Sequence, residues 1–479
     1  MLSGLEEFEN QESQVRSYVR RFPAVFSKAQ GSELWDTHAK RYIDFFCGAG
    51  TLNYGHNNPH AKAALLEYIY RDGIQHSLDT ATEAKAEFLA ALNDLILAPR
   101  GLEYRVQFPG PTGTNAVEAA CKLARKKTQR SHIVAFTRAY HGHSLGALAL
   151  TANSYYHDEH YGSHNNVSHL PFDGYMDGLD SGDLLRRMLS DPSSGIPKPA
   201  AVILETVQGE GGIRVASKQW LRAVADVCKQ QGVLLIVDDI QVGNGRTGPF
   251  FSFEESGIEP DIVCLSKSLG GGLPLAIVLV RPDVDVWKPG QHTGTFRGNN
   301  LAFVAATALL EYWRDDSLQK RTLKLHEVIV RRLKRLAASF PDVHAEVRGR
   351  GLIIGLDLRS GELANRVIES CFAQGLLLEA SGAEDEVLKI MPALTISPEL
   401  LVEGLRILES AVTHVLGNLL DSKRLASGAQ EQDQVFVRES RAADCQVAKN
   451  VSPILSGADF SDNHIWASMA SPFQSPFQN

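Results

Sequence analysis

Residues 200–240 read AAVILETVQGEGGIRVASKQWLRAVADVCKQQGVLLIVDDI, and the apolar pattern of this stretch predicts the class of fold. Two short apolar runs, 200–206 and 233–240, flank segment 218–232, in which apolar residues recur at helical spacing before a final glycine. Uninterrupted runs of Val, Ile and Leu are typical of strands buried on both faces, as in a parallel sheet covered by helices. The stretch therefore predicts a strand, a helix and a second strand, joined as a right-handed crossover unit.

Similar runs extend to both sides of this unit. They lie at 133–136, 261–267 and 275–280, and a helix is expected over 114–127. From residue 316 a long charged helical stretch precedes shorter helix and strand units, which indicate a smaller α+β domain. The last part of the chain is polar and without periodicity, so a flexible tail is expected there. We expect an α/β protein divided into 1–60 (first part of the small domain), 61–315 (large domain), 316–420 (second part of the small domain) and 421–479 (tail).

The composition argues against several classes of protein. The 479 residues include 48 basic and 56 acidic side chains, and the net charge of −8 disfavours a dedicated nucleic-acid binder and polybasic attachment to a membrane. No apolar run is long enough to span a bilayer, and the acidic N-terminus lacks the features of a signal peptide. The six cysteines form no CxxC pair, which is typical of isolated thiols in a reducing compartment. These features predict a cytoplasmic protein.

Three charged residues follow the predicted buried strands. Glu205, Asp238 and Lys267 each lie at the carboxyl end of an apolar run, where open α/β sheets bind their ligands. A salt-bridge network without a reaction is the alternative, although buried ion pairs are a poor source of stability. Desolvation lowers the pKa of a lysine and frees its amine as a nucleophile. A nearby aspartate would suit the ring nitrogen of pyridoxal phosphate.

Two further features fit that cofactor. In PGPTGTNAVEAA (109–120), Gly113 permits close approach of the backbone and Thr114 stands at a helix N-terminus, where phosphate binds well. Tyr140, which follows the run 133–136, offers an aromatic face for the ring. Each feature is weak by itself, because N-terminal caps after glycine and aromatic residues after strands are common.

Four spaced motifs together identify a family. LETVQGEGG (204–212), VDDIQVGNGRTG (237–248), LSKSLGGGLPL (265–275) and GTFRGNN (294–300) resemble the signature blocks of class III pyridoxal-phosphate aminotransferases, in the order and spacing of that family. One departure is Asp239, where the family usually has glutamate. The resemblance covers roughly residues 15 to 420, and it leaves the tail outside.

The resemblance implies a fold-type I transferase with a mostly parallel, seven-stranded type of sheet, and it implies roles for individual residues. Lys267 would bond to the cofactor and move the proton, and Asp238 would pair with the pyridine nitrogen. Thr295 would reach the phosphate of the neighbouring subunit, which implies a homodimer with shared active sites. The implied cofactor-binding residues are Gly113, Thr114, Tyr140 (stacked on the ring), Glu205, Asp238, Gln241 (on the phenolic oxygen), Lys267 and Thr295.

The residues expected to bind the substrates show a second departure from the family pattern. Glu210 matches a family glutamate that can neutralise or release a carboxylate-binding arginine, but VLKIMPALTI (387–396) has Lys389 in place of that arginine. Lysine is a point charge and cannot make the planar two-pronged grip of arginine. Lys389, Arg297 or another arginine is therefore the candidate for binding the carboxylate of 2-oxoglutarate. The alternative is that Lys389 is an ordinary surface residue of a strand.

The implied reaction moves the terminal amino group between L-2,4-diaminobutyrate and 2-oxoglutarate, giving L-aspartate 4-semialdehyde and L-glutamate, and is expected to run towards diaminobutyrate. The alternatives are a related ω-aminotransferase acting on ornithine, 4-aminobutyrate or lysine, an aminomutase or racemase, and a catalytically silent protein that binds a partner through its tail. No metal is expected, because HDEH (157–160) lacks the HExxH spacing of a zinc site. The expected partners are small amino acids and 2-oxo acids.

Overall fold

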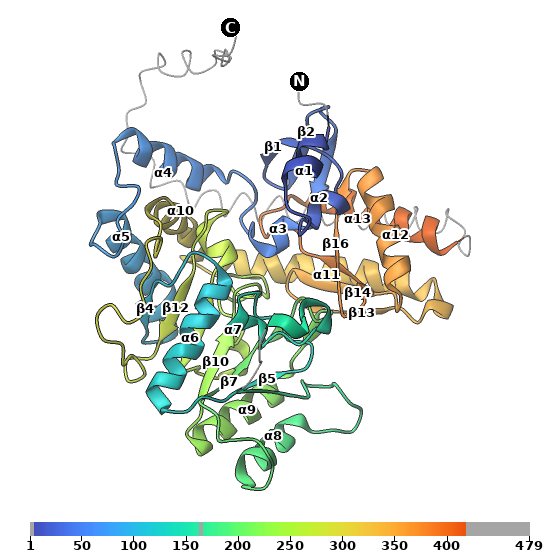
Figure 1. Ribbon diagram of the computed structural model, residues 1–479. Helices are drawn as coiled ribbons and strands as arrows, with labels where there is room; N and C mark the ends of the chain where they lie inside the picture. The colour runs from blue at the N-terminus through green and yellow to red at the C-terminus, as the bar shows by residue number, and fades with distance from the viewer. Residues whose placement is uncertain (1–3, 162–165, 418–479) are drawn as a thin grey trace. The chain divides into compact units, whose positions relative to one another are not determined.

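A seven-stranded sheet lies in the middle of the chain, with strand order β4-β12-β11-β10-β7-β5-β6 (Figure 1). The strands β10, β11, β7, β5 and β6 pair in parallel, whereas β12 pairs antiparallel with both β11 and β4. The mostly parallel sheet predicted from the sequence is thus confirmed. Its strands are β4 (Arg105–Gln107), β5 (Ile133–Phe136), β6 (Val167–Leu170), β7 (Ala201–Leu204), β10 (Leu234–Asp238), β11 (Ile262–Leu265) and β12 (Ile277–Val280).

The computed structural model describes residues 4–161 and 166–417, which belong to one compact unit. The predicted tail, 421–479, lies outside these described residues. The other helices and short strands of the first three hundred residues are α1 (Glu6–Gln11), α2 (Tyr18–Arg21), α3 (Cys47–Gly50), α4 (Pro59–Tyr70), α5 (Glu83–Leu92), α6 (Gly113–Thr128), α7 (Leu145–Leu148), α8 (Ser181–Ser190), β8 (Val207–Gln208), β9 (Arg214–Val215), α9 (Lys218–Gln231) and α10 (Asn300–Leu310).

The crossover unit predicted from residues 200–240 is present as β7, α9 and β10. Ser217 caps α9 by accepting a hydrogen bond from the backbone of Trp220, and the helix ends at Gly232 with φ +58°. This left-handed conformation is one that glycine adopts at little cost. One face of the sheet packs on α6, because alternate strand residues such as Ile203 and Ile236 share a buried cluster with the apolar side of that helix.

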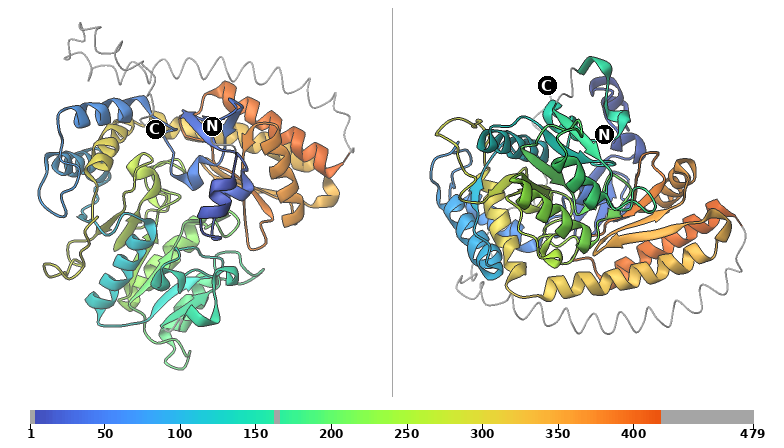
Figure 2. Two further views of the ribbon diagram at one scale, coloured as in Figure 1. Left: turned by 45° about the horizontal axis from the view of Figure 1, so that its top comes forward. Right: turned by 90° about the horizontal axis from the view of Figure 1, so that it is seen from below.

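A second sheet of four antiparallel strands, in the order β13-β14-β17-β16, lies towards the C-terminus. Its strands are β13 (Glu346–Arg350), β14 (Ile353–Asp357), β16 (Glu379–Ser381) and β17 (Val387–Ile390), and its helices are α11 (Ser317–Ala338), α12 (Gly361–Ala373) and α13 (Pro398–Leu416). The right-hand view of Figure 2 shows the long helix α11 beside α13. These elements form the smaller α+β part that the sequence predicted.

Both ends of the described chain contribute to this smaller part. The strands β1 (Phe26–Gln30), β2 (Glu33–Asp36) and β3 (Arg41–Asp44) form a sheet whose last member is β15 (Leu376–Leu377), parallel to β3. Segments that are more than 300 residues apart in the sequence therefore share one sheet. This arrangement agrees with the expectation of a small domain built from both chain ends.

Two local features differ from simple sequence expectations. The run 275–280 resembles the parallel strands, but β12 is antiparallel, because the connection from β11 holds only the 3-10 turn Lys267–Gly270 and no crossover helix. The helix and strand units expected after residue 316 include no hairpin, but GRGLIIGLDL (349–358) belongs to the hairpin of β13 and β14. Gly351 forms its turn with φ +57°, and a Cβ there would lie 2.3 Å from the Arg246 backbone oxygen.

Candidate active site

The carboxyl ends of three neighbouring parallel strands bring Glu205, Asp238 and Lys267 to one edge of the large sheet. Glu205 follows β7, Asp238 ends β10 and Lys267 comes two residues after β11. Burial raises the pKa of Glu205 well above its usual value, and the negative charge of Asp238 adds to the rise. The three charged residues that the sequence singled out therefore do lie within electrostatic reach of one another.

The amine of Lys267 has the surroundings of a nucleophile. Its Nζ donates a hydrogen bond to the backbone oxygen of Ala49 at 2.8 Å. Burial lowers the pKa of Lys267, while the carboxylate of Glu210 opposes the fall. The backbone of Lys267 is left-handed, with φ +47°, a strained conformation for a residue with a side chain. The lowered pKa agrees with the expectation from the sequence.

Asp238 is oriented by a buried histidine. Oδ2 of Asp238 lies 2.8 Å from Nδ1 of His141, whose side chain is fully buried. A carboxylate accepts hydrogen bonds, so Nδ1 of His141 carries the proton. The other ring nitrogen of His141, Nε2, has no hydrogen-bond partner among the described residues. Asp238 also accepts a hydrogen bond from the backbone N–H of Ile240 at 3.2 Å.

The N-terminus of α6 forms a narrow cradle. Thr112 and Asn115 make a reciprocal capping box, and Gly113 begins the helix. The hydroxyls of Thr114 and Ser144 lie 2.6 Å apart. A Cβ on Gly142 would lie 2.6 Å from the Thr114 hydroxyl, so only glycine fits at that position. The first turn of a helix offers unpaired N–H groups and a positive dipole end, which suit a phosphate.

Tyr140 connects this cradle to the strand ends. Its backbone N–H donates a hydrogen bond to Oε2 of Glu205 at 3.1 Å. Its ring packs edge-on against His143 and Tyr156, with ring centroids 5.3 and 5.9 Å away. Contacts of both its backbone and its ring therefore keep Tyr140 in position.

Gln241 connects the surroundings of Lys267 to Glu210. Its amide nitrogen donates to the Ala49 oxygen at 3.1 Å and to Oε1 of Glu210 at 2.9 Å. A Cβ on Gly209 would lie 1.7 Å from the amide oxygen of Gln241, so a side chain at Gly209 is excluded. The Ala49 oxygen, in the glycine-rich segment 48–56, thus accepts hydrogen bonds from both Lys267 and Gln241.

Glu210, Lys389 and Glu379 form an ion cluster. Nζ of Lys389 lies 2.7 Å from Oε1 of Glu210 and 2.9 Å from Oε1 of Glu379, and the lysine side chain is fully buried. The interpretation of Lys389 as a surface residue is therefore wrong, because β17 is covered on both faces.

Opposite charges set the ionisation of this cluster. Burial disfavours the carboxylate of Glu210, but the ammonium groups of Lys389 and Lys267 outweigh burial and lower the pKa of Glu210 to about 2. Burial also disfavours the Lys389 ammonium, yet Glu210 and Glu379 together raise its pKa. For Glu379 burial prevails and raises the pKa, with Lys389 acting against it. Lys389 is thus a permanent cation.

Thr295 and Arg297 lie in the segment between β12 and α10. The backbone oxygen of Thr295 accepts a hydrogen bond from Nε2 of His76 at 2.9 Å, and Thr295 is exposed. Arg297 lies 3.5 Å from Oδ2 of Asp79. In the described part of the chain no hydrogen bond connects Thr295 to the other predicted cofactor-binding residues. The structure of one chain therefore brings together all of those residues except Thr295.

Sequence reasoning did not find three features of the site. Glu379 was missed because its contact with Lys389 depends on strand register. The Ala49 oxygen was missed because a backbone group leaves no signal in the sequence. The contact of His141 with Asp238 was not foreseen either, and it makes His141 the residue that orients this carboxylate. The only sequence signal for Glu379 was a charged residue within an otherwise apolar segment.

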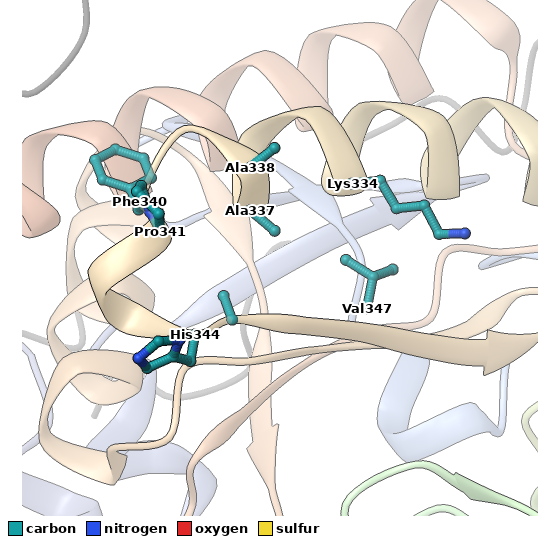
Figure 3. Close-up of a pocket in the computed structure, with 8 residues that line it drawn as sticks. Lys334, Ala337, Ala338, Phe340, Pro341, His344 and Val347 are labelled. Atoms are coloured by element: carbon teal, nitrogen blue, oxygen red, sulfur yellow. The ribbon is translucent and has the colours of Figure 1, made fainter.

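Other parts of the molecule do not compete with this site. A hollow of about 300 Å³ lies between the end of α11 and β13 and contains none of the predicted site residues. Figure 3 shows the residues that line it. Within residues 4–161 and 166–417 no three His, Cys, Asp or Glu side chains gather as a metal site. None of the helices in these ranges has the length and apolar character needed to cross a membrane.

Comparison with known proteins gives the family. The model of the family described as aminotransferase class-III matches residues 15–412. The chain belongs to the class-III aminotransferases. Two curated relatives of this aminotransferase are diaminobutyrate–2-oxoglutarate transaminases, from Wolinella succinogenes (55% identical, covering 85% of this chain and 96% of the relative) and Bordetella parapertussis (54% identical, 86% and 96%).

Solved structures agree with this membership. An ornithine aminotransferase from Toxoplasma gondii is similar with a TM-score of 0.75 and 27% identity, covering 86% of this chain and 94% of that one. An acetylornithine aminotransferase from Elizabethkingia anophelis is similar with a TM-score of 0.71 and 26% identity, covering 85% and 97%. The aminotransferase therefore has the fold-type I architecture that its motifs implied.

Class-III aminotransferases depend on pyridoxal 5′-phosphate, which is the cofactor of this chain. The residues at the strand ends fit that group. Lys267 offers a desolvated amine, Asp238 offers a buried carboxylate for a ring nitrogen, and the unpaired Nε2 of His141 marks a polar position that the chain leaves open. The small residues around the start of α6 leave room for a phosphate.

Proposed function

We propose that this aminotransferase moves the terminal amino group between L-2,4-diaminobutyrate and 2-oxoglutarate, giving L-aspartate 4-semialdehyde and L-glutamate, and that it runs towards diaminobutyrate. The buried ion cluster beside Lys267 is the observation that supports this choice most strongly. The cluster offers a cation to a substrate carboxylate and carboxylates to a substrate ammonium group. Diaminobutyrate and 2-oxoglutarate differ in charge, so a site that binds both needs groups of both signs. The names of the curated relatives point to the same pair of substrates.

Lys267 and Asp238 are the proposed catalytic residues. Bound pyridoxal phosphate supplies an electron sink for the negative charge that develops when a substrate carbon loses its proton. The Nζ of Lys267, kept neutral more easily by its lowered pKa, carries that proton between carbon atoms. The carboxylate of Asp238 holds a proton on the ring nitrogen, and His141 keeps this carboxylate in position through Nδ1.

The other proposed cofactor contacts follow the geometry of the site. The first turn of α6, with Gly113 and Thr114, holds the phosphate through backbone N–H groups and a hydroxyl. Tyr140 would stack on the ring. Gln241 would donate to the phenolic oxygen in place of one of its hydrogen bonds to the Ala49 oxygen and Glu210. Glu205 is the last of the proposed cofactor-site residues. It accepts a hydrogen bond from the backbone N–H of Tyr140 and so keeps Tyr140 in position.

Glu210 and Lys389 are proposed to recognise the substrates. A substrate carboxylate would take the place of Glu210 at the Lys389 ammonium, and Glu210 would return when that carboxylate leaves. Lys389 suits this exchange because its raised pKa keeps it charged at any physiological pH. The Arg297 guanidinium contacts Asp79 instead, so Lys389 is the stronger candidate.

We further propose a homodimer in which Thr295 completes the partner's phosphate site. Thr295 is exposed, and so is its neighbour Phe296, at 68%. Large apolar side chains are exposed on α4 and in the segment after it, namely Leu66, Ile69, Tyr70, Ile74 and Leu78. Such a patch is typical of a protein–protein interface. Light scattering of the purified protein measures the assembly directly.

The domain limits and the location are also proposals. The large sheet lies between residues 105 and 280, which supports a large cofactor-binding domain over 61–315, with 1–60 and 316–420 forming the small domain. A tail over 421–479 follows from composition alone. The free cysteines of the described residues are buried, which supports a reducing compartment and hence the cytoplasm; they are Cys47, Cys121, Cys228, Cys264 and Cys371.

A screen of donors and acceptors tests the proposed reaction. The pure holoenzyme is assayed with diaminobutyrate, ornithine, 4-aminobutyrate and lysine, each with and without 2-oxoglutarate. We expect the highest kcat/KM for diaminobutyrate and a strict dependence on 2-oxoglutarate. Turnover without a 2-oxo acid would instead identify an aminomutase or racemase. A cofactor spectrum unchanged by every donor would identify a catalytically silent protein.

A further inference from the structure

The ion cluster of Glu210, Lys389 and Glu379 contains two carboxyl groups and one ammonium group. The side chains of Lys389 and Glu379 are 0% and 3% exposed, and that of Glu210 is 26% exposed. A charge that is left over in such a place is poorly screened, so it acts on a bound molecule more strongly than a surface charge would.

The two carboxylates are held in different ways. Glu379 on β16 stands directly opposite Lys389 on β17 in the antiparallel register, so the sheet itself maintains their contact. The hydroxyl of Tyr18 donates a hydrogen bond to the second oxygen of Glu379 at 3.3 Å. Glu210 instead lies in the turn between β8 and β9, with glycine on both sides. Glu379 is therefore the permanent partner of Lys389, and Glu210 is the exchangeable one.

The cluster lies close to the reacting amine. Glu210 is joined through Gln241 to the Ala49 oxygen, which also binds Nζ of Lys267. The charges of Glu210, Lys389 and Glu379 all act on the pKa of Lys267. A small substrate whose terminal amine reacts at Lys267 therefore experiences the field of Glu379 at its other end.

We propose that Glu379 determines which terminal amine the site accepts, because its buried carboxylate gives the part of the site that binds the non-reacting end of the substrate a negative charge that favours an amino acid with a second ammonium group. This inference rests on the proposed function. Diaminobutyrate carries two ammonium groups and one carboxylate, whereas 4-aminobutyrate lacks the second ammonium and 2-oxoglutarate is a dianion. The extra carboxylate thus favours the α-ammonium of the first and repels the uncompensated carboxylates of the second and third.

Glu379→Gln tests the charge with little change in shape, because the amide oxygen still accepts a hydrogen bond from Lys389. We expect the KM for diaminobutyrate to rise about tenfold and the KM for 2-oxoglutarate to stay or fall, since removing one poorly screened charge is worth about one order of magnitude. Glu369→Gln, on the exposed side of α12, makes the same change in net charge and should leave both KM values unchanged.

Two further measurements keep the test decisive if the glutamine variant does not fold. Glu379→Asp retains the charge and should retain the wild-type ratio of the two KM values. The wild-type enzyme should use diaminobutyrate with a kcat/KM at least about tenfold above that for 4-aminobutyrate. A Glu379→Gln enzyme in which both KM values rise together, or a wild type that uses the two donors equally, would overturn the role of Glu379. A wild type without diaminobutyrate turnover would overturn the proposed function itself.

Discussion

At the scale of single residues, Lys267 shows how burial prepares a side chain for chemistry. Its pKa falls because the ammonium is desolvated, although Glu210, Glu379 and Asp238 oppose that fall. The balance leaves an amine that is charged less readily than a surface lysine. Lys389 is paired directly with carboxylates and stays charged, whereas Nζ of Lys267 contacts a neutral backbone oxygen.

Replacing Lys267 should separate catalysis from stability. We expect Lys267→Ala to lower the rate of amino transfer by at least about four orders of magnitude, because the only nucleophilic amine at the strand ends is lost. The melting temperature should change by less than about 5 °C, since no ion pair is broken. Lys320→Ala, at a lysine that is 72% exposed, is the matched control and should keep full activity. Full activity in Lys267→Ala would refute the mechanism.

Asp239, which replaces the glutamate usual in the family, should make stability depend on pH. Burial raises the pKa of Asp239 to about 7, against the hydrogen bonds from Ser252. Because an unfolded aspartate titrates near ~3.9, the folded state holds this proton more tightly. The group therefore stabilises the fold below about pH 4, and this contribution is lost as the pH rises to about 7, a change of about 4 kcal/mol.

Urea denaturation at a series of pH values measures this effect. We expect the free energy of unfolding of Asp239→Asn to fall less steeply between pH 4 and 7 than that of the wild type, because asparagine has no proton to lose there. Asp226→Asn, at an exposed position of α9, should follow the wild-type slope. Identical slopes for Asp239→Asn and the wild type would show that Asp239 is already ionised at pH 4.

At the scale of elements, the buried guanidinium of Arg246 joins three separate segments. Its side chain donates to the backbone oxygens of Leu352 and Pro392, at 2.9 and 2.6 Å, and to Oδ1 of Asn53 at 2.5 Å. Arg246 is fully buried, and its turn (243–248) follows β10, which ends at Asp238. The large sheet is thus tied to both chain ends through one side chain.

Removing this guanidinium should destabilise the molecule. We expect Arg246→Met to lower the free energy of unfolding by about 3 kcal/mol or more, because three buried acceptors lose their donor. Arg187→Met, whose side chain is 78% exposed in the wild type, is the control and should cost less than about 0.5 kcal/mol. Thermal and urea unfolding give both values. Equal stability of the two variants would mean that water or another donor replaces the guanidinium.

At the scale of the whole molecule, the proposed phosphate site takes residues from two chains. The start of α6 contributes Gly113 and Thr114, while Thr295 is exposed on a segment near the apolar patch of α4. A second copy that covers this patch would bury it and bring its own Thr295 to the cradle. Dimerisation and cofactor retention should therefore be linked.

Thr295→Ala should weaken cofactor retention without dissociating the dimer. We expect the colour of the cofactor to be lost about tenfold faster on dialysis, since one hydroxyl contact to a phosphate is worth about 1.4 kcal/mol. Thr295→Ser keeps the hydroxyl and should retain the cofactor like the wild type. Light scattering gives the assembly of each variant. Unchanged retention in the alanine variant would exclude Thr295 from the phosphate site.

Much of this molecule follows from local sequence patterns. The unit β7, α9 and β10 was predictable because apolar runs and helical spacing act within about twenty residues, and Glu205, Asp238 and Lys267 could be placed at strand ends for the same reason. The family motifs extended this prediction to the other proposed cofactor-binding residues. Local patterns do not indicate whether neighbouring strands run parallel or antiparallel. The antiparallel course of β12 and the hairpin of β13 and β14 were therefore not foreseen.

Contacts between distant segments follow from packing alone. Lys389 could be a surface residue or a substrate-binding one from its sequence surroundings, and it is the pairing of β16 with β17 that places it against Glu379. The same holds for Ala49, which is more than 200 residues from Lys267 along the chain. Apolar periodicity is a property of neighbours in the sequence and can be read there, whereas charge pairing across a sheet depends on register and on the folding of the whole chain.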